Sequence, residues 1–223
     1  MEIKDYIKDN VFELLSVALF SCSCMFLINK TLLILILILS SLALSMIIFY
    51  FCFKYERKRI EELASLKFFS SFLSKLSEGK SAKISYENSA HFLIGYFPIQ
   101  SYETVLETES CPYSIYRYSC FFTEILKKDK NNEALLPNYL PLRNDVLKNI
   151  ESDRSFLVKT KNIKRLSFLI ANLSVLVILT LYAFFPSLHF IFSPPFNYIL
   201  GFLFSFVSPV IECCYFYNLR KKK

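Results

Sequence analysis

The chain has 223 residues, of which 54% are hydrophobic, 17% are aromatic and only 3 are glycine. A soluble domain has roughly 45–50% apolar residues, and here the surplus lies in continuous runs, so the composition excludes an ordinary soluble protein and indicates an integral membrane protein. The net charge of +7 does not indicate nucleic-acid binding, because the basic residues gather at the ends of the apolar runs.

The first 53 residues predict a transmembrane hairpin. Residues 11–29 form one apolar run that contains Glu13 near its start, and residues 31–53 form a second run without a formal charge. About 20 apolar residues are enough for a helix to cross the hydrocarbon core. Residues 54–59 follow the second run directly and include four basic side chains, which are typical of a cytoplasmic helix end. We therefore expect both ends of the hairpin to be cytoplasmic.

Residues 54–165 predict a cytoplasmic helical domain. This region holds 19 of the 26 basic and 14 of the 19 acidic residues, which is close to the composition of a soluble protein. Its first part continues the second span as an amphipathic helix, because apolar residues recur at three- and four-residue steps: Ile60, Leu63, Leu66, Phe69, Leu73 and Leu76. No segment alternates as a strand does, so a small all-helical bundle is expected.

The other elements of this domain are predicted from turn and cap residues. Gly79 is expected to end the first helix, and Ser81 to cap a helix that reaches about Gly95. Residues 114–130 predict a further helix. Pro137 and Pro141 mark the main loop, and an amphipathic helix then leads to the next span.

Residues 166–223 predict a second transmembrane hairpin with a basic tail. Its spans are expected at residues 166–185 and 196–217, joined by a short external connection that holds His189. The basic residues favour the same side at all four inner helix ends. The fold class expected is all-α, with four transmembrane helices flanking the helical domain, in the cytoplasmic (plasma) membrane with both termini cytoplasmic.

Two acidic residues fall inside predicted spans. Glu212 lies in the last span, where an ionisable group indicates either a paired or a functional role. We expect a structural pair with Arg220 or with a neighbouring helix, and a proton or ion pathway is the alternative. Glu13 is expected at the inner end of the first span, where a carboxylate favours a helix N-terminus.

The seven cysteines predict reduced thiols rather than a disulfide framework. Five lie in apolar runs, and Cys111 and Cys120 lie in the predicted cytoplasmic domain. Acylation of the adjacent Cys213 and Cys214 remains an open alternative, because juxtamembrane cysteines are the usual acceptors.

No pattern predicts a catalytic, cofactor or metal site. His91 is the only histidine of the predicted domain, and Cys111 and Cys120 lack the spacing of metal ligands. Gly79-Lys80-Ser81 matches the end of a phosphate-binding loop, but the upstream glycine is missing. We therefore expect a protein that is not an enzyme and binds no cofactor.

The order of two spans, about 110 helical residues and two further spans resembles the type II secretion system F family, which includes the inner-membrane platform proteins of Tad and other type IV pilus systems. Residues 68–87 are similar to the glycine turn and small-residue helix of that family, with matches at Gly79, Ser81, Ala82, Ser85 and Glu87. The resemblance implies a non-enzymatic platform that binds a cytoplasmic secretion ATPase and acts on pilin-like subunits. It also implies assembly as a homo-oligomer or in a larger complex.

Two other functions remain open from the sequence. A membrane-anchored interaction protein of another system would have the same pattern of spans and charges. A transporter or channel subunit is disfavoured, because the spans show neither paired charges nor the glycine-rich broken helices of such proteins.

Overall fold

The computed structural model describes residues 3–28, 31–109, 113, 118–131, 139–185 and 194–221. Across these ranges every regular element is a helix and none is a strand, which confirms the all-helical prediction. The helices are α1 (Ile3–Asp9), α2 (Val11–Leu27), α3 (Thr31–Ser77), α4 (Ala82–Ser89), the 3₁₀ helix η1 (Ala90–Leu93), α5 (Tyr102–Thr108), α6 (Ser119–Lys130), α7 (Leu140–Phe184) and α8 (Pro194–Lys221).

The chain divides into two compact units. One, here called the polar unit, comprises Arg57–Phe156, and the other, the apolar unit, comprises Glu2–Glu56 and Leu157–Lys223. Helices α3 and α7 each contribute residues to both units.

Three helices are long and apolar enough to cross a membrane, namely α3, α7 and α8. Helix α2, at the place of the first predicted span, has 17 residues. The count of four spans therefore stays a prediction, since α2 is shorter than the roughly 20 residues of a typical crossing. The predicted external turn at Asn29 and Lys30 and the connection with His189 lie outside the described residues.

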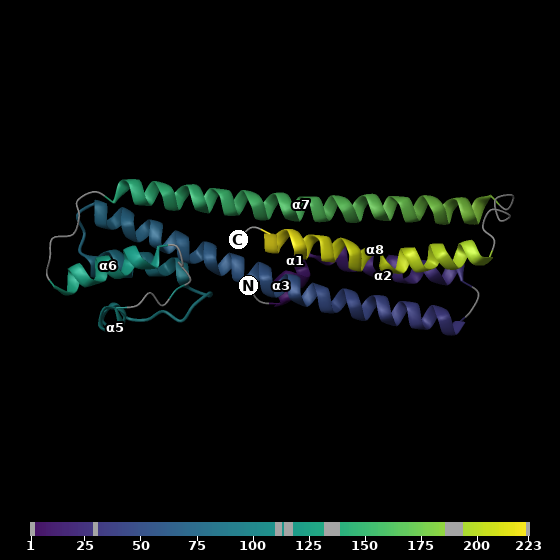
Figure 1. Cartoon of the computed structure of the whole chain (residues 1–223), viewed down its shortest axis with the longest axis horizontal. Coiled ribbons are helices and arrows are strands. Elements are labelled where there is room, and N and C mark those ends of the chain that lie inside the picture. The colour runs from purple at the N-terminus through teal and green to yellow at the C-terminus, as the bar shows by residue number, and fades with distance from the viewer. Residues whose placement is uncertain are drawn as a thin grey trace. The chain divides into compact units, whose positions relative to one another are not determined.

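Helices α2 and α8 and the adjoining parts of α3 and α7 lie side by side in the apolar unit (Figure 1). The Phe20 ring of α2 stacks on the Phe168 ring of α7 with their centroids 6.3 Å apart. Ser21 and Ser41 hydrogen bond at 2.7 Å between α2 and α3, and Asn172 of α7 donates to Ser16 of α2 at 2.8 Å. Successive helices thus alternate in direction, as in an up-and-down bundle.

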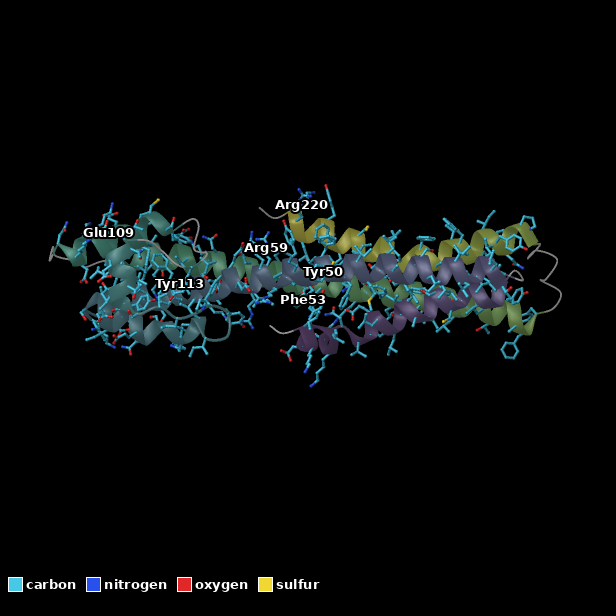
Figure 2. The ribbon with its side chains drawn as sticks, turned by 90° about the horizontal axis from the view of Figure 1, so that it is seen from below. Tyr50, Phe53, Arg59, Glu109, Tyr113 and Arg220 are labelled. Carbon is cyan, nitrogen blue, oxygen red and sulfur yellow. The ribbon has the colours of Figure 1, made fainter. Side chains whose placement is uncertain are left out.

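The apolar unit exposes many large apolar side chains, and its interior contains small polar side chains beside buried apolar ones such as Phe20 and Phe168. In the most apolar stretch of α7 only 11% of the residues are buried. Tyr50 of α3 is exposed and Phe53 is buried; both are labelled in Figure 2. The buried polar side chains include a series of serines: Ser16, Ser21, Ser23, Ser41, Ser45, Ser205 and Ser208. This distribution is typical of helices packed in a bilayer, where lipid covers the apolar surface and small residues allow close helix packing.

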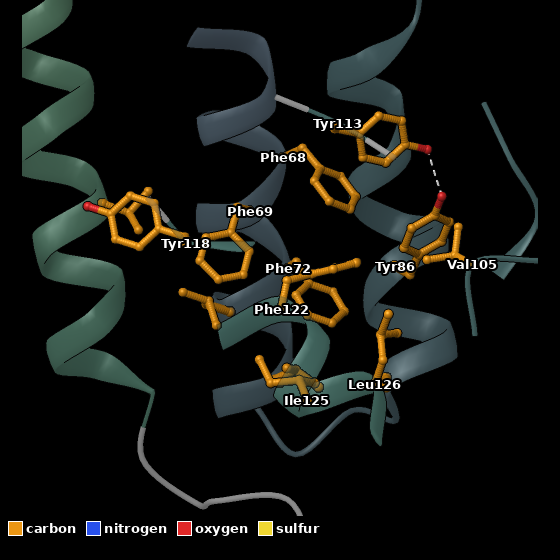
Figure 3. Packing of buried hydrophobic residues seen from close by; sticks show 14 of the residues in the cluster. Phe68, Phe69, Phe72, Tyr86, Val105, Tyr113, Tyr118, Phe122, Ile125 and Leu126 are labelled. Carbon is orange, nitrogen blue, oxygen red and sulfur yellow. Dashed lines mark hydrogen bonds between the residues drawn. The ribbon is translucent and has the colours of Figure 1, made fainter. Parts of the chain in front are cut away.

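The polar unit has a core rich in aromatic rings (Figure 3). Phe122 of α6 lies at its centre, with ring centroids 5.4 Å from Phe72 and 6.2 Å from Phe68. Tyr86 of α4 and Tyr113 share a hydrogen bond of 2.7 Å between their hydroxyl oxygens. The core is built mainly from α3, α4, α5 and α6, and Val146 and Ile150 of α7 also belong to it.

The polar unit differs from the sequence prediction in several places. Helix α5 was not predicted, and α4, which was expected to reach about Gly95, ends at Ser89 and is followed by η1. The predicted stripe on α3 contained Phe69, Leu73 and Leu76, whereas the structure also buries Phe68 and Phe72 completely. Pro141, which was predicted to lie in a loop, is the second residue of α7. Proline is compatible with the first turn of a helix, because the backbone N–H groups there have no intrahelical acceptor. Pro137 lies outside the described residues.

Candidate functional site

The predicted turn at Gly79 ends α3 in a Schellman motif. The Gly79 N–H donates to the Leu76 carbonyl at 3.0 Å, and the Lys80 N–H donates to the Lys75 carbonyl at 3.2 Å. Gly79 has a φ of 81°, which favours glycine. Ser81 then caps α4, since its side chain accepts the Ile84 N–H at 3.4 Å.

The small residues of α4 lie on one buried face. Ala82 and Ser85 are fully buried, and Ser89 donates to Ser71 of α3 at 3.0 Å. Of the five residues of the resemblance, Gly79 forms the turn, Ser81 forms the cap, and Ala82 and Ser85 are buried, whereas Glu87 is exposed.

A second set of side chains stands out because it is charged and buried. Glu13 of α2, Glu56 of α3, Lys164 of α7 and Glu212 of α8 are each no more than 6% exposed. We call these four residues the charge cluster. All belong to the apolar unit. Buried charges are costly unless they are paired or hydrogen-bonded, so the partners of each indicate its state.

Glu56 is held by two phenols. Tyr6 of α1 donates to its Oε1 at 3.4 Å, and Tyr215 of α8 donates to the same oxygen. Burial, followed by the charge of Glu56, raises the pKa of Tyr6, so this phenol keeps the proton that it donates.

Lys164 is surrounded by aromatic rings and one amide. Its Nζ donates to Asn10 Oδ1 at 3.2 Å and lies 4.8 Å from the centroid of the Tyr215 ring and 5.9 Å from that of Phe49. Asn10 in turn donates through Nδ2 to the Tyr6 carbonyl at 2.8 Å. These contacts stabilise an ammonium that is only 2% exposed.

Glu13 faces a guanidinium at the edge of the unit. Arg165 Nε lies 3.6 Å from Glu13 Oε1, which is the distance of an ion pair but longer than a hydrogen bond. The Arg165 side chain is half exposed, whereas that of Glu13 is 1% exposed. The sequence predicted Glu13 at the start of a span, and the structure adds that it is buried.

Glu212 has no partner of either kind. Neither carboxylate oxygen has a hydrogen-bond partner, and the described ion pairs do not include it. Arg220, the expected partner, is exposed and points away from the helices of the apolar unit (Figure 2). The Cys52 thiol donates to the backbone carbonyl of Glu212 at 3.9 Å.

A pocket of about 130 Å³ opens beside the charge cluster between α7 and α8. Lys164 and Tyr215 line it together with Thr160, Ser167 and Asn218, and Val210 and Ile211 form its apolar wall. A space of this size admits a few water molecules, and the polar side chains of the lining can hydrogen bond to them.

The five described cysteine side chains and the described histidine show no arrangement typical of a reactive site. Cys22, Cys52, Cys120, Cys213 and Cys214 are free thiols, and of these only Cys52 is buried in the protein. His91 Nδ1 is 2.9 Å from the Asn88 carbonyl at an exposed position. Within the described ranges no group of three or more His, Cys, Asp or Glu side chains could hold a metal ion. Cys111 lies outside those ranges.

The sequence indicated two members of the charge cluster, Glu13 and Glu212, as acids inside predicted spans, but it did not indicate Glu56 or Lys164 as buried charges. Lys164 did not stand out because it is one of several basic residues at a predicted helix end. Glu56 did not stand out because it lies within a run of basic residues. The signal that could have found Glu56 is this isolated acid directly after an apolar span.

Comparison of the chain with protein-family models, with curated proteins and with solved structures finds no match.

Proposed function

We propose that this chain is a non-enzymatic platform protein of the cytoplasmic membrane that serves a type II secretion or Tad-like pilus system. One observation carries the proposal: α3 and α7 each have an exposed apolar part and a second part that supplies the aromatic core of the polar unit. A protein built in this way holds a folded helical unit at a membrane. The glycine turn and the buried small residues of α4 support the resemblance to platform proteins.

The proposed topology has four spans, with α2 as a short first span and with the polar unit and both termini in the cytoplasm. The basic residues at the inner helix ends support this orientation. Fusions of alkaline phosphatase, which is active only outside the cytoplasm, test it. We expect no activity for fusions after Asn131 or after Lys223, and activity at either position would contradict the proposal.

The proposed partners are a secretion ATPase for the polar unit and pilin-like subunits for the apolar unit. A photo-crosslinking amino acid at Ile84 of α4, which is 49% exposed, is expected to capture the ATPase. The same amino acid at Leu169 of α7, which is 46% exposed, is expected to capture pilin-like subunits or a second copy of the chain. Position Phe122 is the control, because it is fully buried and should capture nothing. Capture of unrelated proteins would contradict the platform function.

Capture of unrelated proteins would support the second candidate, a membrane-anchored interaction protein of another system.

The charge cluster gives a specific reason to test a transporter or channel subunit as well, because buried ionisable groups in membrane helices often mark ion pathways. Ion flux into liposomes that contain the purified protein, and its loss in Glu212→Gln, would support that function.

A further inference from the structure

Glu212 differs from the two other acids of the charge cluster in having, among the described residues, neither a hydrogen bond nor an ion pair to its carboxyl group. Glu56 accepts hydrogen bonds from two phenols, and Glu13 has Arg165 at 3.6 Å. Glu212 is 1% exposed, and both of its oxygens lack a hydrogen-bond partner. An ionised carboxylate in such surroundings is strongly disfavoured, whereas a neutral carboxyl group is not.

The charges around Glu212 lead to the same conclusion. Three carboxylates, those of Glu13, Glu56 and Glu212, face two cations, Lys164 and the half-exposed Arg165. One negative charge is therefore in excess. Binding one proton would make these five side chains neutral as a set. Glu212 is the carboxylate that would lose the fewest stabilising contacts by accepting this proton.

The groups that act on Glu212 come from every helix packed around it. Lys164 of α7 attracts its negative charge, and Glu13 of α2 repels it. The other titratable groups of this region are Tyr6 on α1, Cys52 and Glu56 on α3, Arg165 on α7, and Cys213 and Tyr215 on α8. Apart from Lys164 and Arg165, none of these groups supplies a positive charge.

We propose that the Glu212 carboxyl group is a proton-binding site that holds its proton at neutral pH in the folded protein. A proton fits this site better than a metal ion. Calcium and magnesium need at least six oxygen ligands, whereas the neighbours of Glu212 include the thiol of Cys52. The ammonium of Lys164 is also nearby and would repel a metal cation. The proposal does not depend on the platform function.

The test uses the full chain in liposomes and dicyclohexylcarbodiimide, an apolar reagent that modifies protonated carboxyl groups. The carboxyl proton moves to a carbodiimide nitrogen as the carboxyl oxygen bonds to the central carbon, and the adduct rearranges to a stable N-acylurea. At pH 7 we expect mass spectrometry to find the label on Glu212. Glu212→Gln should lose at least nine-tenths of the label, and the matched control Glu151→Gln, at an exposed position of α7, should keep it.

Three results would overturn the proposal: no label on Glu212 between pH 5 and pH 8, label on Glu13 instead, or protection of Glu212 by sodium ions, which would indicate a cation site.

Infrared spectroscopy gives a second readout that does not depend on reagent access. The carbonyl stretch of a protonated carboxyl group should be present in the wild-type chain at pH 7 and absent in Glu212→Gln. A wild-type spectrum without this band would also overturn the proposal.

Discussion

Tyr215, near the end of α8, donates a hydrogen bond to Glu56, which lies 159 residues earlier in the chain on α3. The ring of the same tyrosine lies 4.8 Å from the Lys164 ammonium. One side chain thus contacts an anion through its hydroxyl group and a cation through its face. Tyr215 therefore links two members of the charge cluster, Glu56 and Lys164.

The first prediction separates these two contacts. Tyr215→Phe keeps the ring beside Lys164 and removes one of the two donors to Glu56, so we expect the free energy of unfolding to fall by about 1 kcal/mol. Thermal unfolding of the purified protein in detergent measures the change. Tyr217→Phe is the matched control, because Tyr217 is 64% exposed, and it should leave the midpoint unchanged. Equal effects of the two changes would contradict the role of the bond to Glu56.

The second prediction concerns the buried ammonium. Lys164→Met removes the bond to Asn10 and both aromatic contacts, and it leaves the acids of the cluster with one cation fewer. We expect a loss of about 2 kcal/mol in the same unfolding experiment. Lys159→Met changes an exposed lysine of α7 in the same way and should have no measurable effect. If Lys164→Met were neutral, the ammonium would not be stabilising the unit.

The third prediction tests the core of the polar unit. Phe122→Ala removes a fully buried ring that contacts Phe68, Phe69 and Phe72. The lost burial and the cavity together should cost about 4 kcal/mol. Its neighbour Phe121 is 46% exposed, so Phe121→Ala should cost far less. Hydrogen exchange of the α6 amides reports the loss locally, and similar exchange in the two variants would refute the placement of Phe122.

The fourth prediction concerns the turn after α3. An added Cβ at Gly79 would meet no atom within 4 Å, so any cost of Gly79→Ala comes from the φ of 81° alone. We expect that cost to be about 1 kcal/mol, and less for Gly79→Asn, because asparagine tolerates the left-handed region. Unfolding midpoints of the two variants test this order. A more stable alanine variant would show that the turn does not have this conformation.

The fifth prediction is a pH dependence. Burial, followed by the hydrogen bond that Tyr102 donates to Asp129 at 2.7 Å, raises the pKa of Tyr102 in the folded protein. In the unfolded chain the phenol ionises with a pKa near 10. The stabilisation from Tyr102 is therefore complete below pH 10 and declines as the pH rises further, because the unfolded state then loses its proton first.

Tyr102→Phe provides the measurement. The wild-type chain should be the more stable of the two at pH 8, and the difference between their unfolding midpoints should shrink as the pH rises above about 10. A difference that grows over this range would mean that the folded protein does not hold the Tyr102 proton.

Several features of this protein follow from the sequence alone. The uninterrupted apolar runs at residues 31–53 and 166–185 predict helices long enough to cross a membrane, and the structure has helix at residues 31–53 of α3 and 166–184 of α7. Gly79 and Ser81 specify the turn and the cap between α3 and α4 through local backbone geometry. Such features depend on neighbouring residues and can therefore be read in order along the chain.

The tertiary structure decided what the charged residues inside the apolar unit do. Glu13, Glu56, Lys164 and Glu212 are far apart in the sequence, and whether each is exposed, paired or alone depends on how four helices pack. The sequence predicted a partner for Glu212, and the structure leaves its carboxylate without one. Local patterns do not encode such contacts, because the energy of a buried charge is determined by the side chains that surround it in space.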